Sequence, residues 1–321
     1  MANDERRTTH FLATLGIGWV ALAAAGIAYA HFRAVPVRIT VFALAAFLIE
    51  YAFYLVPAFP QVRERFSGMR LPVFMVASAV LPYLASCLAK GFHWIGLAKV
   101  LAAALALGLW FFALPPGVLT DLGFLAAVAY LVLSHYFQGV YAIPARGVDL
   151  GILGRLAVAQ MAAMALMVGR RIPETGYGFL PSRKEWRIGA VHFLLFAPIG
   201  LPIALIVKAV KFAPTQPVWL IAGTFLGALW VVALFEEFAF RGVLQPMFEQ
   251  WTGSRAAALA ITSALFGLAH LPFRAFPNWR WVLVAGVLGW FCGRARNRAG
   301  SIRAGMVTHA LVITAWRAFF V

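Results

Sequence analysis

Apolar residues form a series of runs, each near 20 residues long, that are separated by short polar connectors. The first run covers 11–30 and follows a polar segment at 1–10. The other runs lie at 37–58, 71–89, 94–113, 118–138, 148–168, 190–207, 217–243, 255–272, 280–294 and 302–320. An apolar helix of this length spans the hydrocarbon core of a bilayer. The pattern therefore predicts an all-α, polytopic transmembrane helix bundle with about 10–11 spans.

The composition supports a membrane location. Hydrophobic residues make up 63% of the chain and charged residues 12%, where a soluble domain has about 45–50% and about 25%. So few charges cannot cover so much apolar surface in water, and 15% aromatic residues argue against disorder. The two cysteines, Cys87 and Cys292, both lie in apolar runs, so we expect neither a disulfide framework nor a cysteine metal cluster.

The chain carries a formal net charge of +16. The Lys and Arg residues lie mostly in the connectors between apolar runs, which is typical of topology signals and contacts with anionic headgroups. We therefore expect the lipid bilayer as a partner and no nucleic acid.

The strongest break in composition is the segment 169–189, in which Gly and Pro alternate with Arg170, Arg171, Arg183, Lys184 and Arg187. It predicts three parts: an N-terminal membrane region of about six helices at 1–168, a basic cytoplasmic loop at 169–189, and a second helix bundle at 190–321. With this loop inside, most basic residues of the second half also lie inside. Six spans before the loop place the N-terminus in the cytoplasm as well.

Two adjacent glutamates lie where a membrane span is expected. Glu236 and Glu237 are surrounded by apolar residues on both sides, and one charge at the bilayer centre costs at least about 2.5–3.5 kcal/mol. Arg241 follows Glu237 by one helical turn, so the two can pair. Glu236 points about 100° away. A carboxylate without a counter-charge in its own helix is suited to accept a proton from water, as a general base does.

Two histidines lie in later runs, near the same expected depth. His270 follows Phe266 by one turn, and His309 lies in the last run. An imidazole can hold a water molecule, donate to an oxyanion or bind a metal. A single membrane histidine more often forms a hydrogen bond between helices, and a Glu–Arg pair is more often a structural clamp. The glutamate pair together with two histidines favours catalysis or proton transfer.

These residues resemble a known family. The stretch FEEFAFRG at 235–242 is similar to the EExxxR motif of the CPBP intramembrane proteases, which include the eukaryotic CAAX prenyl endopeptidase. Phe266 and His270 resemble the second motif, FxxxH, and His309 matches the histidine of the third, HxxxN. Ile313 occupies the position of the Asn. The resemblance covers roughly 175–321.

The resemblance implies glutamate-dependent peptide-bond hydrolysis within the membrane. Glu236 would activate water, His270 would help to hold it, and Glu237 with Arg241 would fix the helix and the local field. His309 would stabilise the oxyanion, with Phe266 in a supporting role. Ile313 cannot donate the hydrogen bond of the family's Asn, so Thr308 or Thr314 would have to be considered.

The resemblance further implies that no cofactor is required, although Glu236, His270 and His309 could bind zinc. The expected substrate is a membrane protein or a lipidated peptide, cleaved near a lipid anchor or a C-terminal helix. The expected location is the bacterial inner membrane. The departure at Ile313 leaves open an alternative, a catalytically weakened membrane scaffold or transport partner.

Overall fold

The computed structural model describes residues 2–134, 136–214 and 217–321. Helices make up the regular structure of these residues, apart from two isolated bridges, Ala145 with Val148 and Phe212 with Phe320. The prediction of an all-α bundle is therefore confirmed. The chain divides into two compact units, Met1–Pro173 and Glu174–Val321. The division falls within the segment 169–189 that the sequence marks as a connector.

The first unit contains the helices α1 (Ala2–Phe32), α2 (Val37–Leu55), α3 (Pro60–Arg63), α4 (Arg70–Lys90), α5 (Trp94–Ala113), α6 (Val118–Leu133) and α7 (Ile152–Met164). Short 3₁₀ turns, η1 (Val56–Ala58) and η2 (Glu64–Phe66), flank α3, and a π-helical turn, η3 (Ala165–Gly169), continues α7. The helix α7 packs against α2, α4, α5 and α6. It is the most buried span of this unit among the described residues, and its glycine and four alanines let neighbouring helices approach.

Polar contacts join the helices of the first unit. Gln160 on α7 donates a hydrogen bond to Ser78 on α4, and Arg170 pairs with Asp121 on α6 at 2.8 Å. Glu50 on α2 is 1% exposed, and neither of its oxygens has a hydrogen-bond partner among the described residues.

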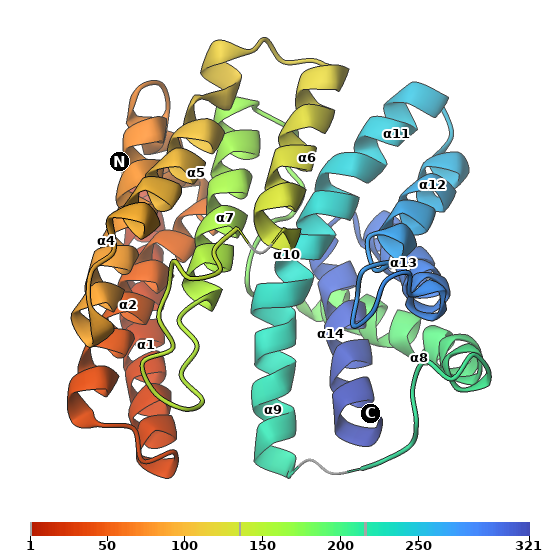
Figure 1. Ribbon diagram of the computed structural model, residues 1–321. Helices are drawn as coiled ribbons and strands as arrows, with labels where there is room; N and C mark the ends of the chain where they lie inside the picture. The colour runs from red at the N-terminus through yellow and green to blue at the C-terminus, as the bar shows by residue number, and fades with distance from the viewer. Residues whose placement is uncertain (1, 135, 215–216) are drawn as a thin grey trace. The chain divides into compact units, whose positions relative to one another are not determined.

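The second unit begins with α8 (Arg183–Ile206), so the helix starts within the segment 169–189. Ser182 and Glu185 form a reciprocal capping box that fixes this start. The chain then forms one continuous helical rod composed of α9 (Val218–Gly227), η4 (Ala228–Ala233), α10 (Leu234–Glu237), η5 (Phe238–Leu244) and α11 (Gln245–Thr252). In Figure 1, α9, α10 and α11 follow one another along this rod. The remaining helices are α12 (Arg255–Leu268), α13 (Trp279–Ala299) and α14 (Ile302–Phe319).

The last helix, α14, lies at the centre of the second unit and packs against α8, α9, η4, α10 and α13. Glycine residues allow neighbouring helices of this unit to approach one another closely. A Cβ atom on Gly189 of α8 would lie 2.5 Å from Cβ of Val307. A Cβ on Gly267 of α12 would likewise lie 2.5 Å from the carbonyl oxygen of Val282 on α13. These close contacts hold the helices that carry the candidate site residues.

Seven helical segments among the described residues are long and apolar enough to cross a membrane. They are Thr9–Phe32, Val37–Ala58, Arg70–Lys90, Trp94–Ala113, Ile152–Gly169, Arg183–Ile206 and Leu220–Thr252. The chain is therefore an integral membrane protein. The sequence predicts more spans than these seven. The helices α6 and α12 are apolar but shorter, and α13 and α14 carry Arg and His residues.

Candidate active site

The glutamate pair lies on one α-helical turn between two π-helical segments. The turn is α10, with η4 before it and η5 after it. A π-helical segment shifts the direction of the side chains that follow it, and such segments are frequent at functional sites. Glu237 is fully buried, whereas the side chain of Glu236 is 27% exposed. The two adjacent carboxyl groups therefore have different surroundings.

Glu237 pairs with Arg241 inside the second unit. Their atoms Oε1 and Nη1 lie 3.2 Å apart, and both side chains are almost completely buried. Nη2 of Arg241 donates a hydrogen bond of 3.0 Å to the carbonyl oxygen of Gly289 on α13. The guanidinium group also lies 4.2 Å from the ring centroid of Phe266 on α12, which is a favourable cation–π distance. Arg241 thus links the rod to α12 and α13.

Two glycines provide space for this ion pair. A Cβ atom on Gly305 of α14 would lie 2.5 Å from Oε2 of Glu237. A Cβ on Gly289 would lie 3.2 Å from Nη2 of Arg241. A side chain at either position would press on a charged group that is packed on all sides, so the buried pair depends on both glycines.

His309 lies between the two glutamates. Its Nδ1 atom is 3.0 Å from Oε1 of Glu237, and its Nε2 atom is 3.8 Å from Oε2 of Glu236. Because a carboxylate accepts hydrogen bonds, Nδ1 carries the proton in the contact with Glu237. The other ring nitrogen then faces Glu236 at a distance slightly too long for a direct hydrogen bond.

His270 approaches the same group of residues from the end of α12. Its Nδ1 atom lies 2.9 Å from the carbonyl oxygen of Phe266, so Nδ1 donates and Nε2 is left to accept a hydrogen bond. The rings of His270 and His309 lie 4.9 Å and 5.6 Å from the ring of Phe266. Both histidines therefore contact one phenyl ring. Among the described residues, no hydrogen bond or ion pair joins His270 directly to a glutamate.

Ile313 lies one turn after His309 and is partly buried. The two threonines considered as substitutes for the family's Asn already donate hydrogen bonds elsewhere. Thr308 donates to the carbonyl oxygens of Gly189 and Ala304 at 3.0 and 3.2 Å. Thr314 donates to the carbonyl oxygen of Ala310 at 2.7 Å. Both hydroxyl groups are therefore already engaged as donors to backbone carbonyl oxygens.

The sequence suggests Glu236, His270 and His309 as metal ligands. Among the described residues, a direct side-chain contact joins Glu236 to His309, and none joins His270 to either. A second group consists of Glu237, Cys292 and His309, whose ligand atoms all lie within 4.8 Å of one another. The guanidinium group of Arg241 already pairs with the same Glu237 oxygen that contacts His309. A divalent cation at this point would meet that positive charge, so the second group fits a metal poorly.

The segment before α8 contributes one more aromatic contact. Tyr177 packs edge-on against Phe238 at 5.1 Å between ring centroids, directly after the glutamate pair in the chain. Burial raises the pKa of the Tyr177 hydroxyl. Tyr177 therefore remains neutral and acts as a packing residue that supports the start of η5.

Residues 217–314 match the family model of the Rce1-like, type II CAAX prenyl endopeptidases. Over this segment the chain is similar to that peptidase family. The matched segment extends from the residue before α9 into α14, so this Rce1-like segment contains all of the candidate site residues. It is a little under a third of the chain, and α8 and the first unit lie outside it. No curated protein and no solved structure matches the chain significantly.

Sequence reasoning missed three contributors to the candidate site. Gly289 and Gly305 are among 28 glycines in the chain, and no local pattern marks them as neighbours of an ion pair. Cys292 is fully buried beside Glu237 and His309, but it looks like any apolar residue of its run. Only their contacts in the folded chain, with Arg241, Glu237 and His309, identify all three.

Proposed function

We propose that the chain is an intramembrane endopeptidase in which Glu236 activates the attacking water. The observation that carries this proposal is the position of His309, which contacts buried Glu237 through Nδ1 and faces Glu236 through Nε2. A histidine held by one carboxylate and directed towards a second, more exposed one is the arrangement of an oriented catalytic group. Membership of residues 217–314 in a peptidase family supports the same reaction.

In the proposed reaction, Glu236 accepts a proton from water while the water oxygen attacks the carbonyl carbon of the scissile peptide bond. Nε2 of His270 is free to accept the second hydrogen of this water and so to orient it. The proton on Glu236 then passes to the nitrogen of the departing amine as the C–N bond breaks. No covalent enzyme intermediate is formed.

His309 would stabilise the negative charge that develops on the carbonyl oxygen. In its doubly protonated form, Nε2–H donates to the oxyanion while Nδ1–H remains bound to Glu237. The Glu237–Arg241 pair keeps this imidazole in place, since Arg241 is itself held by Gly289 and Phe266. Glu237 and Arg241 are thus positioning residues in the proposal.

The substrate that we propose is a membrane protein or a lipidated peptide cleaved close to the bilayer surface. The matched family is described as a prenyl endopeptidase, and the site residues are carried by helices of a membrane-embedded bundle. The reaction as proposed requires no metal, because the positive charge that acts on Glu237 comes from Arg241. Cleavage should therefore persist after dialysis against EDTA.

The test compares wild type with Glu236→Gln and with Glu249→Gln, a matched control on α11 that pairs with exposed Arg255. The purified proteins are incubated with fluorogenic peptides that carry a C-terminal prenylcysteine motif. Wild type and Glu249→Gln should release the fluorophore, whereas Glu236→Gln should not. Cleavage by Glu236→Gln at the wild-type rate would show that another group activates the water. Failure of wild type to cleave any of these peptides would remove prenylated peptides from the proposal.

We also propose that the segment around 169–189 faces the cytoplasm of a bacterial inner membrane, with the N-terminus on the same side. Its basic residues support this orientation. Lys184 is exposed, so Lys184→Cys should react with a membrane-impermeant maleimide only after the cells are opened. The wild-type protein serves as the control for labelling of the native Cys87 and Cys292. Labelling of intact cells would reverse the orientation.

A further inference from the structure

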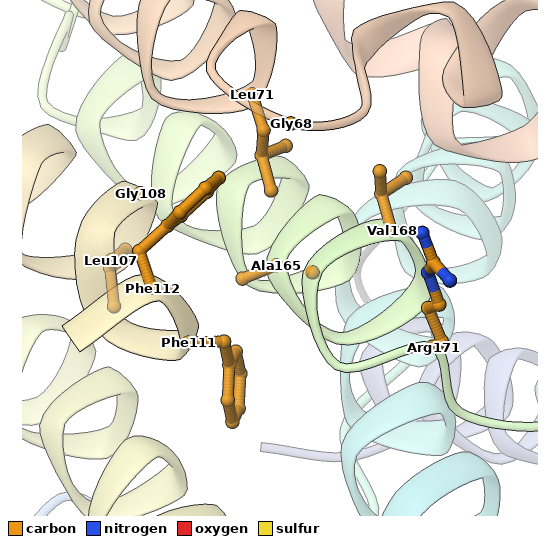
Figure 2. A pocket seen from close by; sticks show the side chains of 10 residues that line it. Gly68, Leu71, Leu107, Gly108, Phe111, Phe112, Ala165, Val168 and Arg171 are labelled. Atoms are coloured by element: carbon orange, nitrogen blue, oxygen red, sulfur yellow. The ribbon is translucent and has the colours of Figure 1, made fainter. Parts of the chain in front are cut away.

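The first unit contains a cavity of about 210 Å³ that the reaction above does not use. It is lined by Gly68, Leu71, Leu107, Gly108, Phe111, Phe112, Ala165, Val168, Gly169 and Arg171. Figure 2 shows the phenylalanines on one side of the cavity and Val168 with Arg171 on the other. An apolar cavity of about 150 Å³ already accommodates a benzene molecule. This cavity therefore has room for a hydrocarbon segment.

Arg171 is the charged side chain in this lining, and it is exposed. Among the described residues, it forms no hydrogen bond or ion pair, whereas the preceding Arg170 is bound to Asp121 at 2.8 and 3.1 Å. The two adjacent arginines thus differ in their contacts. Arg170 has a structural partner within the first unit, and Arg171 presents a guanidinium group without a protein partner at the edge of the cavity.

The cavity lies where two membrane spans end. The span Ile152–Gly169 ends at Gly169, and the span Arg70–Lys90 starts two residues after Gly68. The ends of spans lie near lipid headgroups, so the apolar lining faces the hydrocarbon boundary and Arg171 the phosphate level. Basic pockets between transmembrane helices are a known form of binding site for anionic lipid headgroups.

We propose that this cavity binds an anionic glycerophospholipid. Part of one acyl chain would pack against Leu107, Phe111 and Val168, and the lipid phosphate would pair with Arg171. The occupant is a lipid rather than free phosphate, because the other side chains of the lining are apolar and offer no further donor to an anion. It is anionic because a guanidinium group without a protein partner favours a ligand with net negative charge.

The test measures lipid binding to the full chain by native mass spectrometry. Dioleoyl phosphatidylglycerol and dioleoyl phosphatidylcholine have the same acyl chains, so their difference reports the headgroup alone. Wild type should bind the anionic lipid more tightly, by about fivefold, which corresponds to one basic residue near the membrane surface. Arg171→Gln should remove this preference. Arg38→Gln deletes the same charge at an exposed position of α2 outside the cavity and should retain it.

A second variant tests the place of the acyl chain. Ala165→Leu extends a lining residue into the cavity and should weaken both lipids equally, and a melting curve shows whether the protein is folded. The proposal fails if Arg171→Gln and Arg38→Gln reduce the preference equally, since a general surface charge would then explain it. It also fails if Ala165→Leu binds both lipids as wild type does, or if inorganic phosphate at equal concentration displaces the anionic lipid.

Discussion

The Nδ1 atom of His309 lies 3.0 Å from Oε1 of Glu237, although 72 residues separate them in the chain. This contact joins α14 to α10 inside the second unit. Arg241 pairs with the same oxygen of Glu237, so one buried carboxylate orients a cation on its own helical rod and an imidazole on another helix. The adjacent Glu236 is more exposed, and its Oε2 atom lies 3.8 Å from Nε2 of the same histidine.

Replacing Arg241 should reduce stability and activity together. Arg241→Ala removes the contacts with Glu237, Gly289 and Phe266 and leaves a buried carboxylate without its partner, which costs about 3–5 kcal/mol. The melting temperature in detergent and peptide cleavage should both fall. Arg255→Ala is the control, because its ion pair with Glu249 is exposed and such pairs contribute about 0–1 kcal/mol. Wild-type stability of Arg241→Ala would contradict the structural role.

Adding one methyl group at Gly305 should disturb the site from the side of α14. The new Cβ would lie 2.5 Å from Oε2 of Glu237 and 3.2 Å from the carbonyl oxygen of Cys292, so the carboxylate that contacts His309 must shift. Overpacking of this kind costs about 1–3 kcal/mol, and the cleavage rate should fall further than the stability loss explains. The control is Gly286→Ala on α13, where the nearest atom is 3.7 Å away. Equal activity of both variants would show that the position of Glu237 is not critical.

Ile313→Asn should increase the cleavage rate. Position 313 lies one helical turn after His309, and Asn can supply a second donor to the oxyanion, which Ile cannot. Loss of one such donor typically costs about 100–1,000-fold in rate, so the gain should be up to about 100-fold. Ile313→Leu is the apolar control and should cleave as wild type does. A rate unchanged by Asn would show that the oxyanion does not lie near position 313.

Glu50 in the first unit should lower the stability of the folded protein. Its side chain is 1% exposed, and its oxygens have no hydrogen-bond partner among the described residues. An unsatisfied buried polar group costs about 1–3 kcal/mol, so Glu50→Met should raise the melting temperature. The exposed Glu64→Met should change stability by less than about 0.5 kcal/mol. A lower melting temperature for Glu50→Met would indicate that the carboxyl group has a stabilising partner.

The sequence by itself determined the helices and the local pairing. Apolar runs near 20 residues predict spans because a helix of that length matches the thickness of the hydrocarbon core, and the observed helices follow these runs. The pairing of Glu237 with Arg241 also follows from the sequence, because residues four apart face each other on a helix. The order and spacing of the glutamates and histidines indicated the protease family before any geometry was known.

Only the tertiary structure decided how these residues meet. The contact between Glu237 and His309, the glycines beside the ion pair and the occupied hydroxyl of Thr308 depend on which helices pack together and at what rotation. The two π-helical segments lie directly before and after α10, the turn that carries both glutamates. Sequence periodicity describes one helix at a time, whereas side-chain packing between helices fixes both distance and direction. For that reason the candidate residues can be predicted from the sequence. The burial of Glu237 and the partial exposure of Glu236 follow only from the fold.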